Sequence, residues 1–185
     1  MKLAMMSQKI KIKLIFLVHA GSNHTNLKAV QVAISAGRIN AEISAIVSDN
    51  QPLPDLEKIS PDYICLAGWK KFIPEELIKK YKILNMHPGL IPETMDGSTL
   101  NPDGTLALWN KGMYADKALA NFINHGATYA GSTLHFLTLD FDFGPVLGRT
   151  FEKIQVGDTV ESLYARLKKK ENELYVEVLE KLTNA

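Results

Sequence analysis

The sequence predicts an α/β fold, specifically a Rossmann-like, mostly parallel sheet with helices on both faces. The apolar run Ile10–His19, the helical pattern of Leu27–Ala36 and the apolar run Ala41–Ser48 form a strand–loop–helix–strand unit, which is the seed of a parallel sheet. The chain has 185 residues, of which 46% are hydrophobic and 22% charged, so it is long enough to enclose a full core. We expect a single domain over residues 10–185, preceded by a flexible leader at 1–9.

Further elements follow in order along the first half of the chain. The first helix is expected to end at Gly37, because glycine readily adopts the left-handed conformation that closes helices. Asp62–Ala67 predicts a third strand. Glu75–Tyr81 predicts a short helix with Pro74 at its first position, acidic residues first and lysines last, as the helix dipole prefers. Lys82–Met86 predicts a fourth strand.

The second half of the chain begins with a long loop, Leu90–Gly104, whose length suggests a functional covering segment. Leu106–Asn124 is predicted to be mostly helical, with an interruption at a glycine. Tyr129–Leu137 and Pro145–Ile154 have strand patterns. Asp158 is expected to cap a long terminal helix.

Composition excludes several classes of protein. The formal net charge is +1, so no overall basic field is available to hold a nucleic acid. No window approaches 18 uninterrupted apolar residues, so no membrane-spanning helix is expected. The one cysteine, Cys65, cannot form an internal disulfide, and no cysteine cluster suggests zinc. We therefore expect a cytoplasmic protein.

Two residues at the end of the fourth strand are the first candidates for chemistry. Asn85 and His87 are two apart and project to the same face of a strand, and open α/β sheets bind ligands beyond the carboxyl ends of their strands. An amide donor and an imidazole should therefore enter one crevice. The alternative is a histidine satisfied by a backbone carbonyl. His135 alternates with core residues on a later strand and is expected to pack near the site.

Asp142 lies in a loop between the last two strands. A carboxylate near His87 would hold one imidazole tautomer and stabilise the charged ring. The alternative is an ordinary turn with a solvated aspartate. A metal centre built from His87, His135 and Asp142 is less favoured, because the histidines lack the close spacing of metal motifs.

The loop Gly21–Asn23 follows the first strand and precedes a helix. Its backbone N–H groups and polar side chains can bind an anion with help from the helix N-terminus, or can simply cap the helix. It matches neither GxGxxG nor GxxxxGK[ST], so a dinucleotide or P-loop nucleotide site is poorly supported.

Glu171 occupies an apolar position of the terminal helix, between Leu167 and Leu174. A buried carboxylate is costly without a partner. It either faces a ligand amine or lies at an edge where it reaches water.

These segments, in this order, resemble the folate-dependent formyltransferase family. The strongest match joins the NxHPxLxP pattern in Leu84–Pro92 to Gly131–Phe136 and to Asp142–Pro145. Weaker matches are Leu66–Trp69 and Ala165–Leu167.

The resemblance implies transfer of a formyl group from 10-formyltetrahydrofolate to a primary amine, with glycinamide ribonucleotide in purine biosynthesis as the favoured acceptor. It implies no metal, and it implies catalysis by Asn85, His87 and Asp142. The residues it assigns to the folate are Leu66, Gly68, Trp69, Lys71, Phe72, Ile73, Thr138, Asp140 and Phe141. The residues it assigns to the acceptor and its phosphate are Gly21, Ser22, Asn23, Thr25, Asn26 and Glu171.

The sequence departs from the family pattern at the loop after the first strand, where His24–Asn26 intervene before the helix. The stretch between Asn50 and Ile64 is shorter than usual, and the segment after Pro92 is longer. Lys71 stands where the family has arginine, and Asn172 where it has histidine.

These departures leave the acceptor open. Another amine, such as an amino-sugar nucleotide, is an alternative to glycinamide ribonucleotide. The same residues are also compatible with a formyltetrahydrofolate hydrolase, or with a folate- or nucleotide-binding module without turnover. The expected partners are a small amine and the folate, without nucleic acid or membrane, in a monomer or homodimer.

Overall fold

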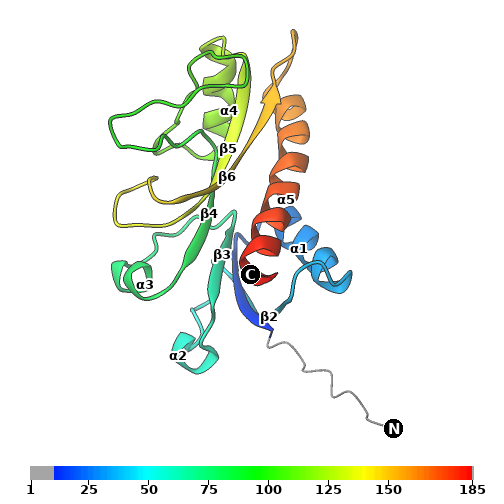
Figure 1. Cartoon of the computed structure of the whole chain (residues 1–185), viewed down its shortest axis with the longest axis vertical. Coiled ribbons are helices and arrows are strands. Elements are labelled where there is room, and N and C mark those ends of the chain that lie inside the picture. The colour runs from blue at the N-terminus through cyan, green and yellow to red at the C-terminus, as the bar shows by residue number, and fades with distance from the viewer. Residues whose placement is uncertain (1–10, 185) are drawn as a thin grey trace.

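A computed structural model describes residues 11–184, in which six strands form one sheet of order β2-β1-β3-β4-β5-β6 (Figure 1). The expected leader at 1–9 lies outside the described residues. The strands are β1 Ile12–Val18, β2 Ala41–Ser48, β3 Tyr63–Ala67, β4 Ile83–His87, β5 Tyr129–Phe136 and β6 Val146–Lys153. The first four are parallel, and β5 is antiparallel to both β4 and β6. The mostly parallel sheet is confirmed.

Helices cover both faces of this sheet, as predicted. They are α1 Thr25–Ser35, α2 Leu56–Ile59, α3 Glu75–Lys80, α4 Ala115–Asn124 and α5 Val160–Asn184. Figure 1 shows α1 and α5 on one side of the sheet and α2 and α3 on the other. Alternate residues of β1 point to opposite faces: Phe16 packs in a core with Val30 of α1 and Tyr175 of α5, while Leu17 packs in a second core with Leu56 of α2.

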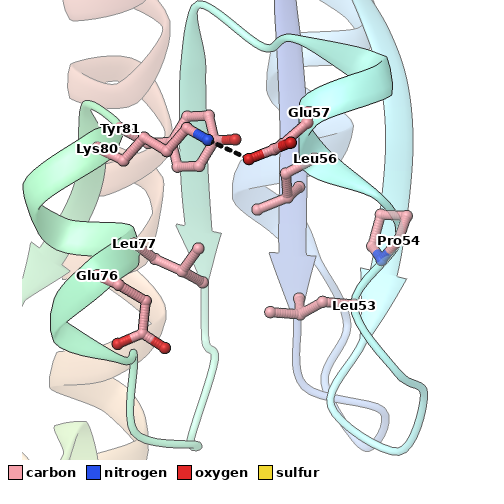
Figure 2. A pocket seen from close by; sticks show the side chains of 8 residues that line it. All are labelled: Leu53, Pro54, Leu56, Glu57, Glu76, Leu77, Lys80 and Tyr81. Carbon is pink, nitrogen blue, oxygen red and sulfur yellow. Dashed lines mark hydrogen bonds and ion pairs between the residues drawn. The ribbon is translucent and has the colours of Figure 1, made fainter.

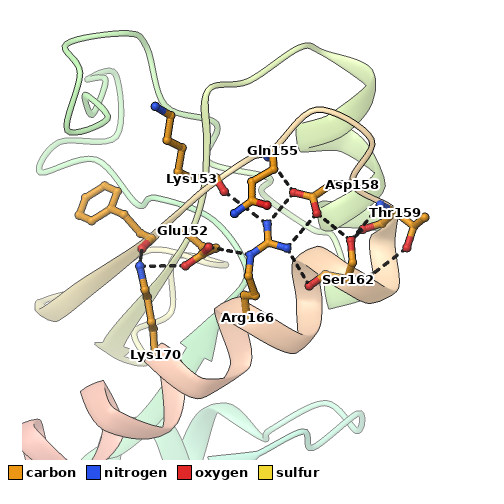
Figure 3. Close-up of polar contacts among 9 residues, drawn as sticks. Glu152, Lys153, Gln155, Asp158, Thr159, Ser162, Arg166 and Lys170 are labelled. Atoms are coloured by element: carbon orange, nitrogen blue, oxygen red, sulfur yellow. Dashed lines mark hydrogen bonds and ion pairs between the residues drawn. The ribbon is translucent and has the colours of Figure 1, made fainter.

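A network of charged groups fixes the start of α5 to β6 (Figure 3). Arg166 donates to both carboxylate oxygens of Asp158 at 2.9 and 2.6 Å and to Glu152 Oε1 at 2.8 Å. Such bidentate, charge-assisted hydrogen bonds are stronger than neutral ones and define orientation. The prediction that Asp158 caps the helix is wrong, because Thr159 Oγ1 accepts the backbone N–H of Ser162 instead. Asp158 turns its carboxylate to Arg166.

Two other local predictions are corrected. Leu106–Tyr114 is not helical, and α4 begins only at Ala115. Asn110 and Gly112 have positive φ angles of 57° and 78°, which a right-handed helix does not allow. This stretch instead pairs with the preceding loop, since Leu108 O accepts the N–H of Leu90 at 3.0 Å. Pro74 is the N-cap of α3 and not its first helical residue.

Within the described part of the chain, no helix is long and apolar enough to cross a membrane.

Candidate functional site

Strand β4 delivers Asn85 and His87 to the carboxyl edge of the parallel strands. The antiparallel neighbour β5 places His135 opposite Asn85 and Thr133 opposite His87. His87 is only 1% exposed, whereas Asn85 is partly exposed. Because side chains two apart share a face, this register brings Asn85, His87 and His135 together.

His135 holds the Asn85 side chain in place. Burial lowers the pKa of His135 to about 4, with a further contribution from the charge of His87, so the ring is neutral at pH 7. Its Nδ1 is 3.0 Å from the Phe136 carbonyl and therefore carries the proton. The unprotonated Nε2 then accepts the Asn85 Nδ2–H at 3.3 Å. This contact leaves the other amide hydrogen of Asn85 available.

The Asp142 carboxylate lies beside His87, as the sequence predicted. His87 Nδ1 is 3.6 Å from Asp142 Oδ1, and the backbone N–H of Gly112 donates to Asp142 Oδ2 at 2.7 Å. Burial alone would raise the pKa of Asp142, but the interactions with His87 and the Gly112 N–H outweigh it, and the pKa is lowered. Asp142 is therefore an anion that favours the protonated form of His87.

The other nitrogen of His87 is covered by the long segment that follows β4. His87 Nε2 donates to the Trp109 carbonyl oxygen at 2.6 Å, and Trp109 Nε1 donates to the Asp142 carbonyl oxygen at 3.0 Å. The sequence also left open a histidine whose ring is hydrogen-bonded to a backbone carbonyl. His87 makes such a contact, to Trp109. Since both ring nitrogens face oxygen acceptors, the surroundings suit a doubly protonated ring.

The loop between β1 and α1 leaves several polar groups unsatisfied. Ser22 N–H donates to the His19 carbonyl at 3.0 Å, which forms a tight turn. The hydroxyls of Ser22 and Thr25 and the Oδ1 of Asn26 are buried without a hydrogen-bond partner in the described structure. Buried polar atoms normally have partners, so an anion or ordered water suits this loop. Gly21 and Asn23 are exposed in the same loop.

This loop lies against the residue that follows β3. A Cβ built on Gly68 would be 3.8 Å from Ser22 Oγ. The β1 and β3 loops therefore share one edge of the sheet.

Glu171 is buried, and its partners come from the protein. Ser132 Oγ donates to Oε1 at 2.6 Å, and Lys168 Nζ donates to Oε2 at 2.8 Å. Burial of Lys168 would lower its pKa, but the Glu171 charge outweighs this effect and raises it. The expectation of a carboxylate on the buried side is confirmed. Because both carboxylate oxygens are already engaged, a ligand amine would have to share or replace one of these contacts.

The residues assigned to the folate fall into two groups. Thr138 and Asp140, with Phe143 and Pro92, line a cavity of about 290 Å³. The Leu66–Ile73 segment does not line this cavity. It buries Leu66 and Ile73 and exposes Gly68, Lys71 and Phe72, while Trp69 is partly buried. Phe72 and Phe141 are 77% and 62% exposed, unusually high values for large aromatic side chains.

A larger cavity of about 380 Å³ lies between α2 and α3, away from the carboxyl end of β4 (Figure 2). Lys80 Nζ pairs with Glu57 Oε1 at 2.5 Å across it, and this contact raises the pKa of Lys80. No motif in the sequence predicted a site at this cavity. The cavity borders the shortened stretch between β2 and β3, where only α2 is present.

No group of three metal-binding side chains is placed to hold an ion among residues 11–184.

Comparison with known proteins gives consistent similarities. The family model described as formyl transferase matches residues 47–179. The chain is 36% identical over 129 residues to phosphoribosylglycinamide formyltransferase, chloroplastic, of Vigna unguiculata, covering 69% of this chain and 37% of that protein. It is 33% identical over 135 residues to the Arabidopsis thaliana protein of the same name, covering 72% and 41%. The chain thus spans about two fifths of the length of these relatives.

Among solved structures, glycinamide ribonucleotide transformylase 1 from Symbiobacterium toebii superposes with a TM-score of 0.76. The superposition covers 100% of this chain and 92% of that one, at 22% sequence identity. At this identity the likeness concerns the fold.

Proposed function

The chain belongs to the formyl transferase family, and from this premise we propose that it transfers a formyl group from 10-formyltetrahydrofolate to the amine of glycinamide ribonucleotide, a step of purine biosynthesis. The observation that carries the proposal is the convergence of Asn85, His87 and Asp142 at the carboxyl end of β4. The names of the Arabidopsis and Vigna relatives support the choice of acceptor.

The proposed role of these three residues is electrostatic. When an amine attacks a formyl carbon, negative charge develops on the formyl oxygen, and positioned N–H donors stabilise it. The free Nδ2–H of Asn85 and a protonated His87 are such donors. The Asp142 carboxylate faces Nδ1 of His87 and can orient a water that carries the proton lost by the amine.

The segment that holds Trp109 limits access to His87. Its carbonyl now accepts the Nε2–H of His87 at 2.6 Å. For Nε2 to serve the formyl oxygen, this hydrogen bond must be exchanged for one to the substrate. We therefore propose that residues 108–112 move when substrate binds.

A cavity and two exposed aromatic rings support the proposed folate contacts. Thr138 and Asp140 border a cavity, and the exposed rings of Phe72 and Phe141 can pack on a planar heterocycle. The remaining proposed folate contacts are Leu66, Gly68, Trp69, Lys71 and Ile73. For the acceptor we propose its phosphate at Gly21, Ser22, Asn23, Thr25 and Asn26, and its glycinamide part near Glu171.

The partners proposed are these two small molecules, without nucleic acid, membrane or metal, and with the protein acting as a monomer or homodimer. A cytoplasmic location remains a prediction. The Arabidopsis and Vigna relatives carry the description chloroplastic, which concerns those proteins.

The test is a transfer assay that follows folate absorbance with 10-formyltetrahydrofolate and glycinamide ribonucleotide. Loss of one donor to a developing oxyanion typically costs about 2.7–4 kcal/mol, so His87→Ala and Asn85→Ala should each reduce turnover by roughly a hundredfold or more. His125→Ala is a matched control, because His125 is an exposed histidine at the end of α4. His87→Gln, checked by circular dichroism, separates catalytic loss from misfolding.

Near-normal turnover in both His87 variants would refute the proposed mechanism. Folate consumption that does not need an amine would instead indicate a hydrolase.

A further inference from the structure

A histidine and an aspartate meet at the ends of the two neighbouring strands β1 and β2. His19 directly follows β1, Asp49 directly follows β2, and His19 Nδ1 is 2.5 Å from Asp49 Oδ2. The other carboxylate oxygen of Asp49 accepts the backbone N–H of Ala20 at 3.1 Å. The contact with His19, followed by that with Ala20, lowers the pKa of Asp49, which is therefore charged at neutral pH.

The second ring nitrogen of His19 faces the loop that precedes α1. A Cβ built on Gly21 would be 3.3 Å from His19 Nε2, and the His19 carbonyl closes the turn to Ser22. In the described structure, this Nε2 has no hydrogen-bond partner, and the side chain is 29% exposed. A Cβ built on Gly68 would be 3.9 Å from His19 Cβ and 3.8 Å from Ser22 Oγ, so His19 and the unsatisfied Ser22 hydroxyl approach the same point of this loop.

We propose that His19, oriented by Asp49, is an additional ligand for the acceptor's phosphate and binds it only in its protonated form. The inference rests on the proposed function, since it assigns a phosphorylated acceptor to the Gly21–Asn26 loop. It assigns a role to a pair of residues that the loop motif Gly21–Asn23 does not include.

The chemistry follows from the geometry of the ring. Nδ1 must carry a proton to donate to the Asp49 carboxylate, so in the neutral ring Nε2 is an acceptor and repels a phosphate oxygen. In the charged ring Nε2–H becomes a donor. Histidine is the side chain that ordinarily changes charge between pH 5 and 8, so phosphate affinity should fall as pH rises through this interval.

Other charged and titratable groups surround the pair. The positive charge of Lys71 acts on Asp49, and the His24 ring donates from Nε2 to the His19 carbonyl at 2.9 Å. Both groups belong to the loops at this edge of the sheet. Lys71 and His24 are unchanged in the variants below. Differences in binding between the wild type and His19→Gln therefore report on His19.

The experiment measures glycinamide ribonucleotide binding by calorimetry between pH 5.5 and 8.5, for the wild type, His19→Gln and Asp49→Asn. A charge-assisted hydrogen bond is worth about 1.5–3 kcal/mol, so wild-type affinity should fall about tenfold to a hundredfold across the range relative to His19→Gln. Glutamine keeps a donor but does not titrate, and His125→Gln serves as the matched control. Asp49→Asn should weaken phosphate binding at pH 5.5, because it removes the carboxylate that orients the His19 ring.

The phosphate itself loses its second proton near pH 6, and this also changes its affinity. Because the effect is common to all variants, comparing each profile with that of His19→Gln cancels it. The dephosphorylated glycinamide riboside should show no dependence on His19. Identical pH profiles for the wild type and His19→Gln, or no phosphate-dependent binding by the wild type, would overturn the inference. A His19-dependent profile without formyl transfer would refute the proposed function alone, whereas transfer with a flat profile would refute only this inference.

Discussion

Two histidines on adjacent strands are held in different surroundings by their hydrogen-bond partners. His87 lies between the Asp142 carboxylate and the Trp109 carbonyl, so both of its nitrogens face acceptors. His135, with its ring centre 6.4 Å away, is neutral because it is buried and accepts from Asn85. The two rings therefore have different partners, the Asn85 amide at His135 and the Asp142 carboxylate at His87.

The first prediction is that His135 makes the free energy of unfolding depend on pH. Its pKa is lowered from 6.5 to about 4 in the folded protein, so the unfolded chain binds more protons between these values. The contribution of His135 to the free energy of unfolding is fully present above pH 6.5. It is lost as the pH falls from 6.5 through about 4, and the loss is on the order of 3 kcal/mol. Urea unfolding at pH 7 and pH 4 should show this loss.

His135→Gln is the control, because its side chain does not titrate. The variant should show a much smaller pH dependence over the same interval. An equal loss in the variant would contradict this account of His135.

At the scale of elements, residues 106–114 were the least predictable from local pattern. Leu106–Tyr114 has apolar spacing compatible with a helix, yet Asn110 donates from Nδ2 to the Pro88 carbonyl at 3.0 Å. A Cβ on Gly89 would come within 1.8 Å of the Trp109 carbonyl oxygen, so only glycine permits this close approach. Contacts with a distant loop therefore outweighed helix propensity here.

The second prediction belongs to the junction of α5 with β6 (Figure 3). Hydrogen bonds from Arg166, first of all, lower the pKa of Asp158 from its ordinary value of 3.8. Because the pKa of Asp158 is lower in the folded protein than in the unfolded chain, its charged carboxylate adds to the free energy of unfolding above pH 3.8. This contribution is lost as the pH falls further. Asp158→Asn should therefore lower the unfolding free energy at pH 7, and the difference from wild type should shrink at pH 3.

Urea denaturation at both pH values measures this effect, with Asp116→Asn as a control at an exposed carboxylate in the first turn of α4. A difference that stays constant with pH would show that the Asp158 charge is not its source.

For the whole molecule, the strand order decides which loops meet. The loops after β1 and β3 share the carboxyl edge of the parallel strands, and the reversed strand β5 returns His135 to Asn85. Open α/β sheets bind ligands at this edge. Folate binding should therefore involve side chains from loops that are far apart in the sequence.

The third prediction tests this arrangement through ligand-linked stability. A non-transferable folate analogue at a hundred times its Kd should stabilise the protein by about 2.7 kcal/mol, or raise its Tm by roughly 5–10 °C. Phe141→Ala should reduce this shift without changing the ligand-free Tm, because the ring is 62% exposed. Val156→Ala, at a fully exposed residue outside the proposed site, should keep the full shift. An unchanged shift in Phe141→Ala would remove this residue from the folate site.

The amino-acid sequence by itself determined the class of the fold, the positions of the strands, and the burial of Glu171, because these follow from hydrophobic periodicity along the chain. The pairing of Asn85 with His87 on one face followed from the two-residue repeat of a strand. Only the tertiary structure decided that Trp109 covers His87, that Ser132 donates to Glu171, and that His19 meets Asp49. These contacts join residues 22 to 39 positions apart through hydrogen-bond geometry, which depends on how strands and loops are placed in space and leaves no periodic signal in the sequence.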